Sequence, residues 1–185
     1  IAEGITKSGQ LSIRWIENKL NKYLNNVLKT DDDYVIASDT DSVYLTLDKL
    51  VTKTIKSDNA LSKTINFLDK VASESIEPYI TKSYDELKQY TNAFANKMFM
   101  KREVIADKGI WVAKKRYILN AHDVEGVRYK EPQLKIMGIE AVKSSTPAPC
   151  RQKIKDALKI IMSGDEKMLN TFIQEFREEL SLIHI

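Results

Sequence analysis

Apolar residues recur at helical spacing in several stretches of the chain. The first pattern predicts an amphipathic helix over about residues 6–28. A second covers about residues 60–91, and Pro78 is expected to break or kink it after Glu77, because proline has no N–H to donate inside a helix. Two more helices are predicted over about residues 151–162 and 165–183.

Between these helices the pattern changes to that of strands. Apolar runs on both sides of the polar segment 38–42 predict a β-hairpin. Residues 98–105 and 110–119 are predicted as paired strands joined by a turn at 106–109, where Asp and Gly favour turns. A short strand is expected at 135–140, and residues 48–59 read as a polar connector. Helices and strands in this order predict an α+β fold.

Two carboxylates fall at or beside the tip of the predicted hairpin. Asp39 and Asp41 are two positions apart, so on an extended backbone they point the same way. A bound cation would relieve their repulsion, and Mg²⁺ is commonly held by one or two carboxylates plus substrate phosphates. A plain hairpin turn fits the same residue types, because Asp and Ser favour turns by bonding to their own backbone.

A basic run, Lys114-Lys115-Arg116-Tyr117, lies on the predicted strand 110–119. On a strand, Lys115 and Tyr117 would face one side, and Lys114 and Arg116 the other. Cations can neutralise DNA phosphates, and a positioned lysine can donate to acceptors in the minor groove. For a short basic run taken alone, an exposed strand that only aids solubility is the favoured interpretation.

Composition sets only loose limits on function. A net charge of +3 is compatible with a nucleic-acid partner without implying one. Cys150 is the single cysteine, so an internal disulfide is impossible, and no Cys/His cluster suggests zinc. No apolar run is long enough to span a bilayer, so a membrane partner is not expected. Because the chain begins at Ile1, within what reads as a helix, we expect a piece of a longer protein.

The acidic and basic motifs together resemble those of family B DNA polymerases. Asp39-Thr40-Asp41-Ser42 is similar to the family's Tyr-Gly-Asp-Thr-Asp-Ser motif, with Ala37-Ser38 in place of Tyr-Gly. Lys114-Lys115-Arg116-Tyr117 is similar to its primer-gripping motif, at a typical downstream separation. Further segments match the polymerases of T-even-type phages in the same order: residues 9–24, 67–70, 99–103, 131–138 and 143–147.

This resemblance implies a fold, a reaction and a metal site. Residues 1–143 would be the C-terminal part of the polymerase palm, an antiparallel sheet backed by helices, and residues 144–185 the start of a helical thumb. The reaction would be transfer of a deoxynucleoside triphosphate onto a primer 3′ end with two Mg²⁺ ions. Asp41 would be the bridging metal ligand, Asp39 a more transient one, and Glu103 a carboxylate beside the metals. Lys101 departs from the phage pattern, where an acid is expected.

The resemblance also implies DNA contacts and partners. Lys115 would reach the minor groove near the primer end, while Lys114, Arg116 and Tyr117 would position backbone and sugar. Thr40 and Ser42 would set the turn close to the primer. The implied partners are primer–template DNA, a deoxynucleoside triphosphate and the rest of the polymerase chain, and a sliding clamp is compatible with them. The implied location is the cytoplasm of a phage-infected bacterium.

Two required parts of a polymerase do not occur in this sequence: the earlier palm motif with another aspartate, and the fingers motif. We therefore expect the chain by itself not to polymerise DNA. Three other interpretations fit parts of the pattern. They are a non-catalytic nucleic-acid-binding module that uses the basic run, another metal-dependent phosphotransferase or nuclease that uses Asp39 and Asp41, and an inactive structural fragment.

Overall fold

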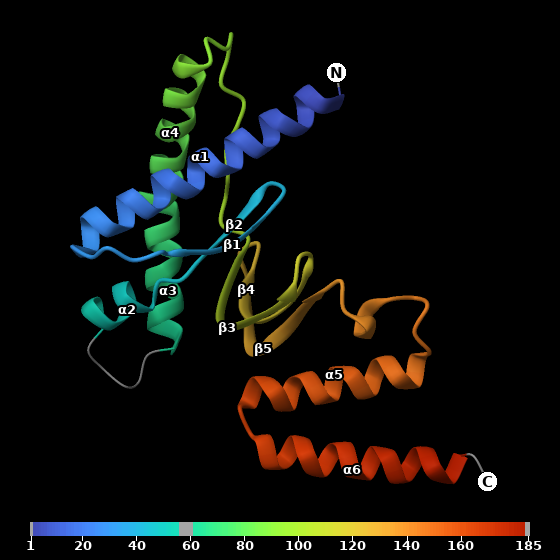
Figure 1. Cartoon of the computed structure of the whole chain (residues 1–185). Helices are drawn as coiled ribbons and strands as arrows, with labels where there is room; N and C mark the ends of the chain where they lie inside the picture. The colour runs from blue at the N-terminus through green and yellow to red at the C-terminus, as the bar shows by residue number, and fades with distance from the viewer. Residues whose placement is uncertain (1, 56–60, 184–185) are drawn as a thin grey trace. The chain divides into compact units, whose positions relative to one another are not determined.

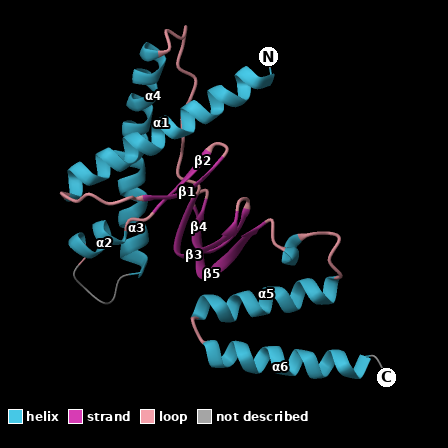
Figure 2. Cartoon of the chain, in the orientation of Figure 1, coloured by secondary structure: helices cyan, strands magenta, loops and turns pink. Residues whose placement is uncertain are grey.

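The computed structural model describes residues 2–55 and 61–183, whose contacts divide the chain into two units, Ile1–Ile105 and Ala106–Ile185. Helices and antiparallel strands occur in both units (Figure 2), which confirms the predicted α+β class. The expected domain boundary after residue 143 is a different division from these units and stays a prediction.

Helix α1 (Ala2–Leu28) organises the first unit (Figure 1). Its buried residues Ile16, Leu20, Leu24 and Leu28 are four positions apart, so they form one face of the helix. That face packs against helix α4 (Glu77–Tyr90), and the indole N–H of Trp15 donates to the backbone oxygen of Ser83 at 2.8 Å. The predicted first helix is confirmed.

The second helical pattern forms helix α3 (Leu61–Val71), a π-helical turn η1 (Ala72–Ile76) and α4 without a break. Figure 1 shows α3 and α4 following one another along one line. Pro78 is expected to clash with the carbonyl of Glu74, four residues earlier. The π turn lies at this point, and a widened turn accommodates the proline while the helix continues.

The expected connector contains helix α2 (Asp48–Thr54), while residues 56–59 of that prediction lie outside the described residues.

Residues 98–103 form no strand, so the predicted strand 98–105 is wrong. Side-chain bonds hold this segment instead. The Arg102 amide donates to Glu77 Oε1 at 2.9 Å, and its guanidinium pairs with Asp69 at 2.7 Å.

The predicted turn at 106–109 is also wrong, because strand β3 (Val104–Ala113) runs through it. A Cβ on Gly109 would lie 2.7 Å from Trp111 Cζ3 and 2.9 Å from Leu119 Cδ2. This glycine therefore makes room for packing within a strand, which is one of the roles glycine has in sheets.

Strands β3, β4 (Arg116–Val124) and β5 (Val127–Met137) form the sheet of the second unit in that order. β4 and β5 are antiparallel, with Tyr117 opposite Met137. The expected short strand 135–140 is thus the end of a longer strand that stops at Met137.

A 3₁₀ turn, η2 (Glu140–Val142), follows the sheet and precedes helices α5 (Ala148–Ser163) and α6 (Glu166–Ile183), which confirms the two predicted C-terminal helices. Leu158 and Met162 of α5 pack with Ile118, Ile139 and Ala141. Within the described ranges, none of the helices combines the length and apolar character needed to cross a membrane.

Candidate functional site

The predicted acidic hairpin is present, and helix α1 holds its base. Strands β1 (Val35–Asp39) and β2 (Ser42–Leu45) pair antiparallel. The side-chain oxygen of Asn21 accepts bonds from the amides of Tyr34 at 2.8 Å and Val35 at 3.1 Å. Tyr34 is buried with Leu24 and Leu28. These contacts fix the position of the hairpin base against α1.

Thr40 and Asp41 form the two-residue turn at the tip, between the paired residues Asp39 and Ser42. Thr40 has φ of 55°, and the Asp41 amide donates to the Asp39 carbonyl at 2.6 Å. Positive φ is unusual for a β-branched residue and stores strain. Because this backbone is a turn, the extended-strand argument for parallel carboxylates does not apply across it.

The two carboxylates at the tip differ in exposure. Asp39 is half-buried and its Oδ1 accepts a bond from Thr40 Oγ1 at 3.0 Å, whereas Asp41 is exposed. Ser42 Oγ donates to the Asp39 backbone oxygen at 3.1 Å. Two such acids fit a Mg²⁺ ion that takes its other ligands from water and substrate phosphates. They do not form a closed protein cage.

Glu103 lies exposed in the segment just before β3, not on a strand as expected. Across residues 2–55 and 61–183, no group of three or more Asp, Glu, His or Cys could hold a metal ion. The structure therefore does not gather Asp39, Asp41 and Glu103 into one cluster, and a metal role for Glu103 stays a prediction.

The basic run is a turn as well as a strand. Lys114 and Lys115 form the two-residue connection between β3 and β4, both exposed, with Lys115 at φ of 60°. The predicted alternation of the four residues across one strand is wrong, because only Arg116 and Tyr117 belong to β4. A two-residue hairpin turn needs positive φ, and Lys115 supplies it.

Arg116 and Tyr117 are anchored within the second unit. Arg116 Nη2 lies 2.6 Å from Glu140 Oε2. Tyr117 is buried, and its ring centroid lies 6.2 Å from that of Trp111. The hydrogen bond from Lys143 and the proximity of Arg116 lower the pKa of the Glu140 carboxyl. Sequence reasoning did not single out Glu140, because it placed this residue at the end of the predicted strand 135–140, whereas β5 ends at Met137.

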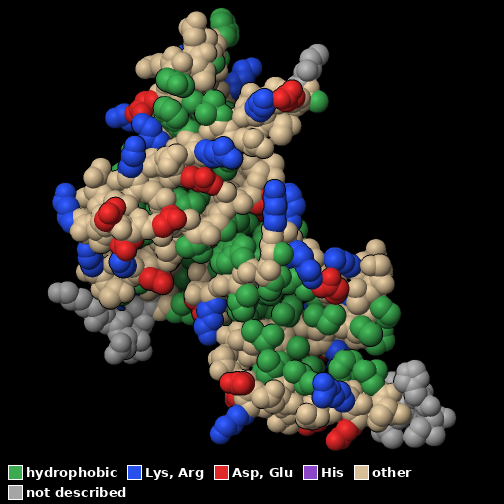
Figure 3. Space-filling view, in the orientation of Figure 1, with side chains coloured by type: hydrophobic (Ala, Val, Ile, Leu, Met, Phe, Trp, Pro, Cys, Tyr) green, Lys and Arg blue, Asp and Glu red, His purple; other side chains and the backbone are tan. Residues whose placement is uncertain are grey.

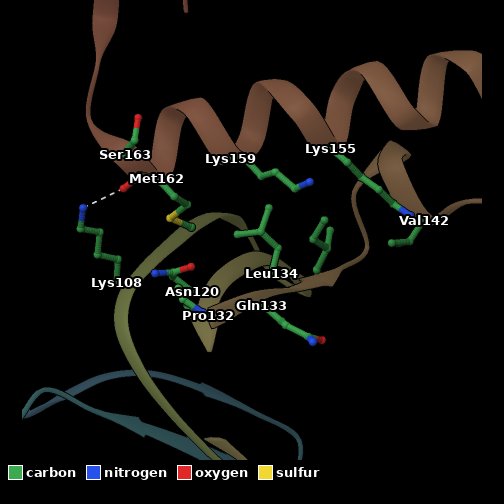
Figure 4. A pocket seen from close by; sticks show the side chains of 11 residues that line it. Lys108, Asn120, Pro132, Gln133, Leu134, Val142, Lys155, Lys159, Met162 and Ser163 are labelled. Atoms are coloured by element: carbon green, nitrogen blue, oxygen red, sulfur yellow. Dashed lines mark hydrogen bonds between the residues drawn. The ribbon is translucent and has the colours of Figure 1, made fainter. Parts of the chain in front are cut away.

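A hollow of about 790 Å³ lies between the sheet and α5 in the second unit (Figure 4). Lys108, Lys155 and Lys159 line it together with amides of Asn120 and Gln133, and its lining contains no carboxylate. Lys108 Nζ donates to the Met162 carbonyl at 2.7 Å. Sequence reasoning missed this site, because its lysines are separated along the chain and show no motif.

The molecular face in Figure 3 carries both signs of charge. Asp and Glu side chains lie among the Lys and Arg side chains there, so the small positive net charge is not gathered into one large basic patch on this face. Local clusters such as the Lys114–Lys115 turn are therefore the features that could bind DNA.

Two curated proteins match most of this chain. It is 42% identical over 175 residues to a DNA-directed DNA polymerase of Escherichia phage RB69, a match that covers 89% of this chain and 19% of that protein. It is 38% identical over 191 residues to a DNA-directed DNA polymerase of Enterobacteria phage T4, covering 96% of this chain and 21% of that protein. The chain thus spans about a fifth of the length of these relatives. No protein-family model matches it.

Proposed function

We propose that this chain, a relative of one segment of the T-even-type phage DNA polymerases, acts within a family B DNA polymerase. In that protein it would supply a catalytic aspartate and the residues that hold the primer end. The observation that carries the proposal is the acidic hairpin tip, Asp39 to Ser42, in a chain that matches these polymerases over most of its length.

The acidic tip would face the triphosphate of the incoming nucleotide. Asp41, exposed at the turn, would be the main metal ligand, and Asp39 would assist it from the end of β1. When bound there, two Mg²⁺ ions would lower the pKa of the primer hydroxyl and offset charge on the phosphate oxygens. Thr40 and Ser42 would set the position of the acids through their bonds to Asp39.

The basic turn would seat the growing strand. Lys115 would donate to the minor-groove edge near the primer end, and Lys114 would neutralise a backbone phosphate. Arg116 and Tyr117 would support the sugar and backbone from the start of β4. The partners would be primer–template DNA, a deoxynucleoside triphosphate and further polymerase regions, with a sliding clamp as an additional candidate.

The metal role of Asp41 can be tested in a chimera, in which this chain replaces the matching segment of the RB69 phage enzyme. Loss of a metal ligand removes several kcal/mol of transition-state stabilisation, so Asp41→Asn should slow primer extension by roughly a thousandfold. Binding of primed DNA should change little. The matched control is Asp31→Asn, which alters an exposed acid in the loop before β1. An Asp41→Asn chimera that extends primers at the unmodified rate would reject the proposal.

The 185-residue chain alone should not extend a primed template. The reason is that the further aspartate motif and the fingers motif of the family do not occur in it. Extension assays with this chain and labelled primer check the point. Incorporation by a preparation free of other polymerases would contradict it.

A non-catalytic nucleic-acid-binding module is the second candidate. The lysine-lined hollow and the exposed Lys114–Lys115 turn favour it. This candidate requires salt-dependent DNA binding, and activity of the chimera that survives loss of both Asp39 and Asp41. Loss of activity in the double alanine variant would exclude it.

A further inference from the structure

Gly138 lies directly against the basic turn. It follows Met137, which pairs with Tyr117, and has φ of +66°. A Cβ at this position would be 2.1 Å from the Lys115 carbonyl oxygen and 3.2 Å from Arg116 Cγ. The nearest atom belongs to the backbone, so a flexible side chain cannot simply move away. Glycine is thus required both for the backbone conformation and for this close approach.

Glu140 forms an ion pair with Arg116, the residue that directly follows the turn. Its Oε2 lies 2.6 Å from Arg116 Nη2, and its Oε1 accepts a bond from Lys143 at 3.0 Å. The residues on either side, Ile139 and Ala141, are buried in the core of the second unit, which sets where the Glu140 backbone lies. The hydrogen bond from Lys143 lowers the pKa of the Glu140 carboxyl.

We propose that Gly138 and Glu140 are positioning residues for the basic turn: Gly138 supports the Lys115 backbone, and Glu140 holds Arg116 so that Lys114 and Lys115 point in one fixed direction. This inference rests on the proposed role of the turn in holding the primer end. Ordering the backbone of a loop on binding costs entropy, and a turn whose backbone is held in advance reduces that cost.

The geometry also separates the roles of the four basic-run residues. Arg116 is already paired with a carboxylate, and Tyr117 is buried, so both act mainly from within the fold. Lys114 and Lys115 are exposed at the turn and can reach a partner. The partner that fits these two exposed ammonium groups is the primer end, where Lys115 would reach the minor-groove edge and Lys114 a backbone phosphate.

The test is a double-mutant cycle in the chimera, with the dissociation constant for primed DNA as the readout. Glu140→Gln should weaken binding about three- to tenfold, which is the net worth of one ordinary hydrogen bond. Lys115→Ala should weaken binding by a similar factor, and in the Glu140→Gln background its effect should shrink by at least about twofold, because the lysine is no longer held in place. Glu131→Gln, an exposed carboxylate on β5, is the matched control and should bind as the unmodified chimera does.

Gly138→Ala provides a second measurement and should weaken binding at least as much as Glu140→Gln. If Glu140→Gln and Gly138→Ala both bind as the unmodified chimera does, the positioning proposal is wrong. It is also wrong if the Lys115 and Glu140 effects are purely additive, because a residue that only stabilises the fold would give that result. If Lys115→Ala alone has no effect, the proposed function of the turn fails, and the positioning proposal fails with it.

Discussion

The side-chain oxygen of Asn21 accepts a hydrogen bond from the Tyr34 amide at 2.8 Å, so one helical residue fixes where the acidic hairpin starts. The same oxygen accepts from the Val35 amide, and the Asn21 amide group donates to Asp33 at 2.7 Å. The Asn21 side chain therefore accepts from the Tyr34 amide and shares the Val35 amide with Asp33 Oδ1, which lies 3.2 Å from it. This relationship links the first helix to the candidate site.

Replacing Asn21 by Ala should lower the free energy of unfolding by about 1–3 kcal/mol, because the Tyr34 amide loses its acceptor, whereas the Val35 amide keeps its bond to Asp33. Urea unfolding followed by Trp15 fluorescence in a Trp111→Phe background measures the first unit. Asn26→Ala on the exposed side of α1 is the control and should change little. Equal effects of the two variants would contradict a special role of Asn21.

Replacing Thr40 by Gly should relieve backbone strain at the hairpin tip. The φ of 55° costs an L-residue about 1–2 kcal/mol, so Thr40→Gly should be more stable than Thr40→Ala by about 1 kcal/mol. Denaturant unfolding of both variants provides the comparison. If the alanine variant is the more stable one, the turn does not hold this strained conformation in solution.

Stability of the first unit should fall at acidic pH partly through Glu86. The hydrogen bond from Lys19 lowers the pKa of the Glu86 carboxyl below its ordinary value of 4.5. A lowered folded-state pKa means that the ionised form stabilises the fold above pH 4.5, and that this stabilisation is lost as pH falls through the lower value. Glu86→Gln should therefore flatten the pH dependence of the unfolding free energy below pH 4.5. Unfolding curves recorded across this range test the prediction, and parallel slopes for the variant and the unmodified chain would count against the ion pair.

Replacing Gly109 by Ala should destabilise the second unit by about 1–3 kcal/mol through overpacking against Trp111 and Leu119. Gly9→Ala adds the same methyl group to α1, where nothing lies within 4 Å, and should not destabilise. Urea unfolding gives the free energies, and methyl NMR shifts of Leu119 report the local change. An unaltered Leu119 signal in Gly109→Ala would show that Leu119 and Gly109 are not in contact.

Local sequence pattern by itself determined the acidic hairpin and the helices other than α2, which was predicted as a polar connector. Helix α1 repeats its buried residues every four positions, and two apolar runs around Asp39 to Ser42 leave few alternatives to a hairpin. The two charged motifs and the further segments, found in the same order, were likewise enough to indicate the resemblance to family B polymerases.

Tertiary packing decided what local pattern could not. Gly109 was predicted to lie in a turn, but it lies within β3, where the Trp111 ring occupies the space that a side chain would need. The Lys114–Lys115 turn comes directly after the last residue of β3. The approach of Gly138 to Lys115 and the pairing of Glu140 with Arg116 join residues more than twenty positions apart. Periodicity records only which face of an element is apolar, whereas such contacts depend on which distant residue the fold brings to that face.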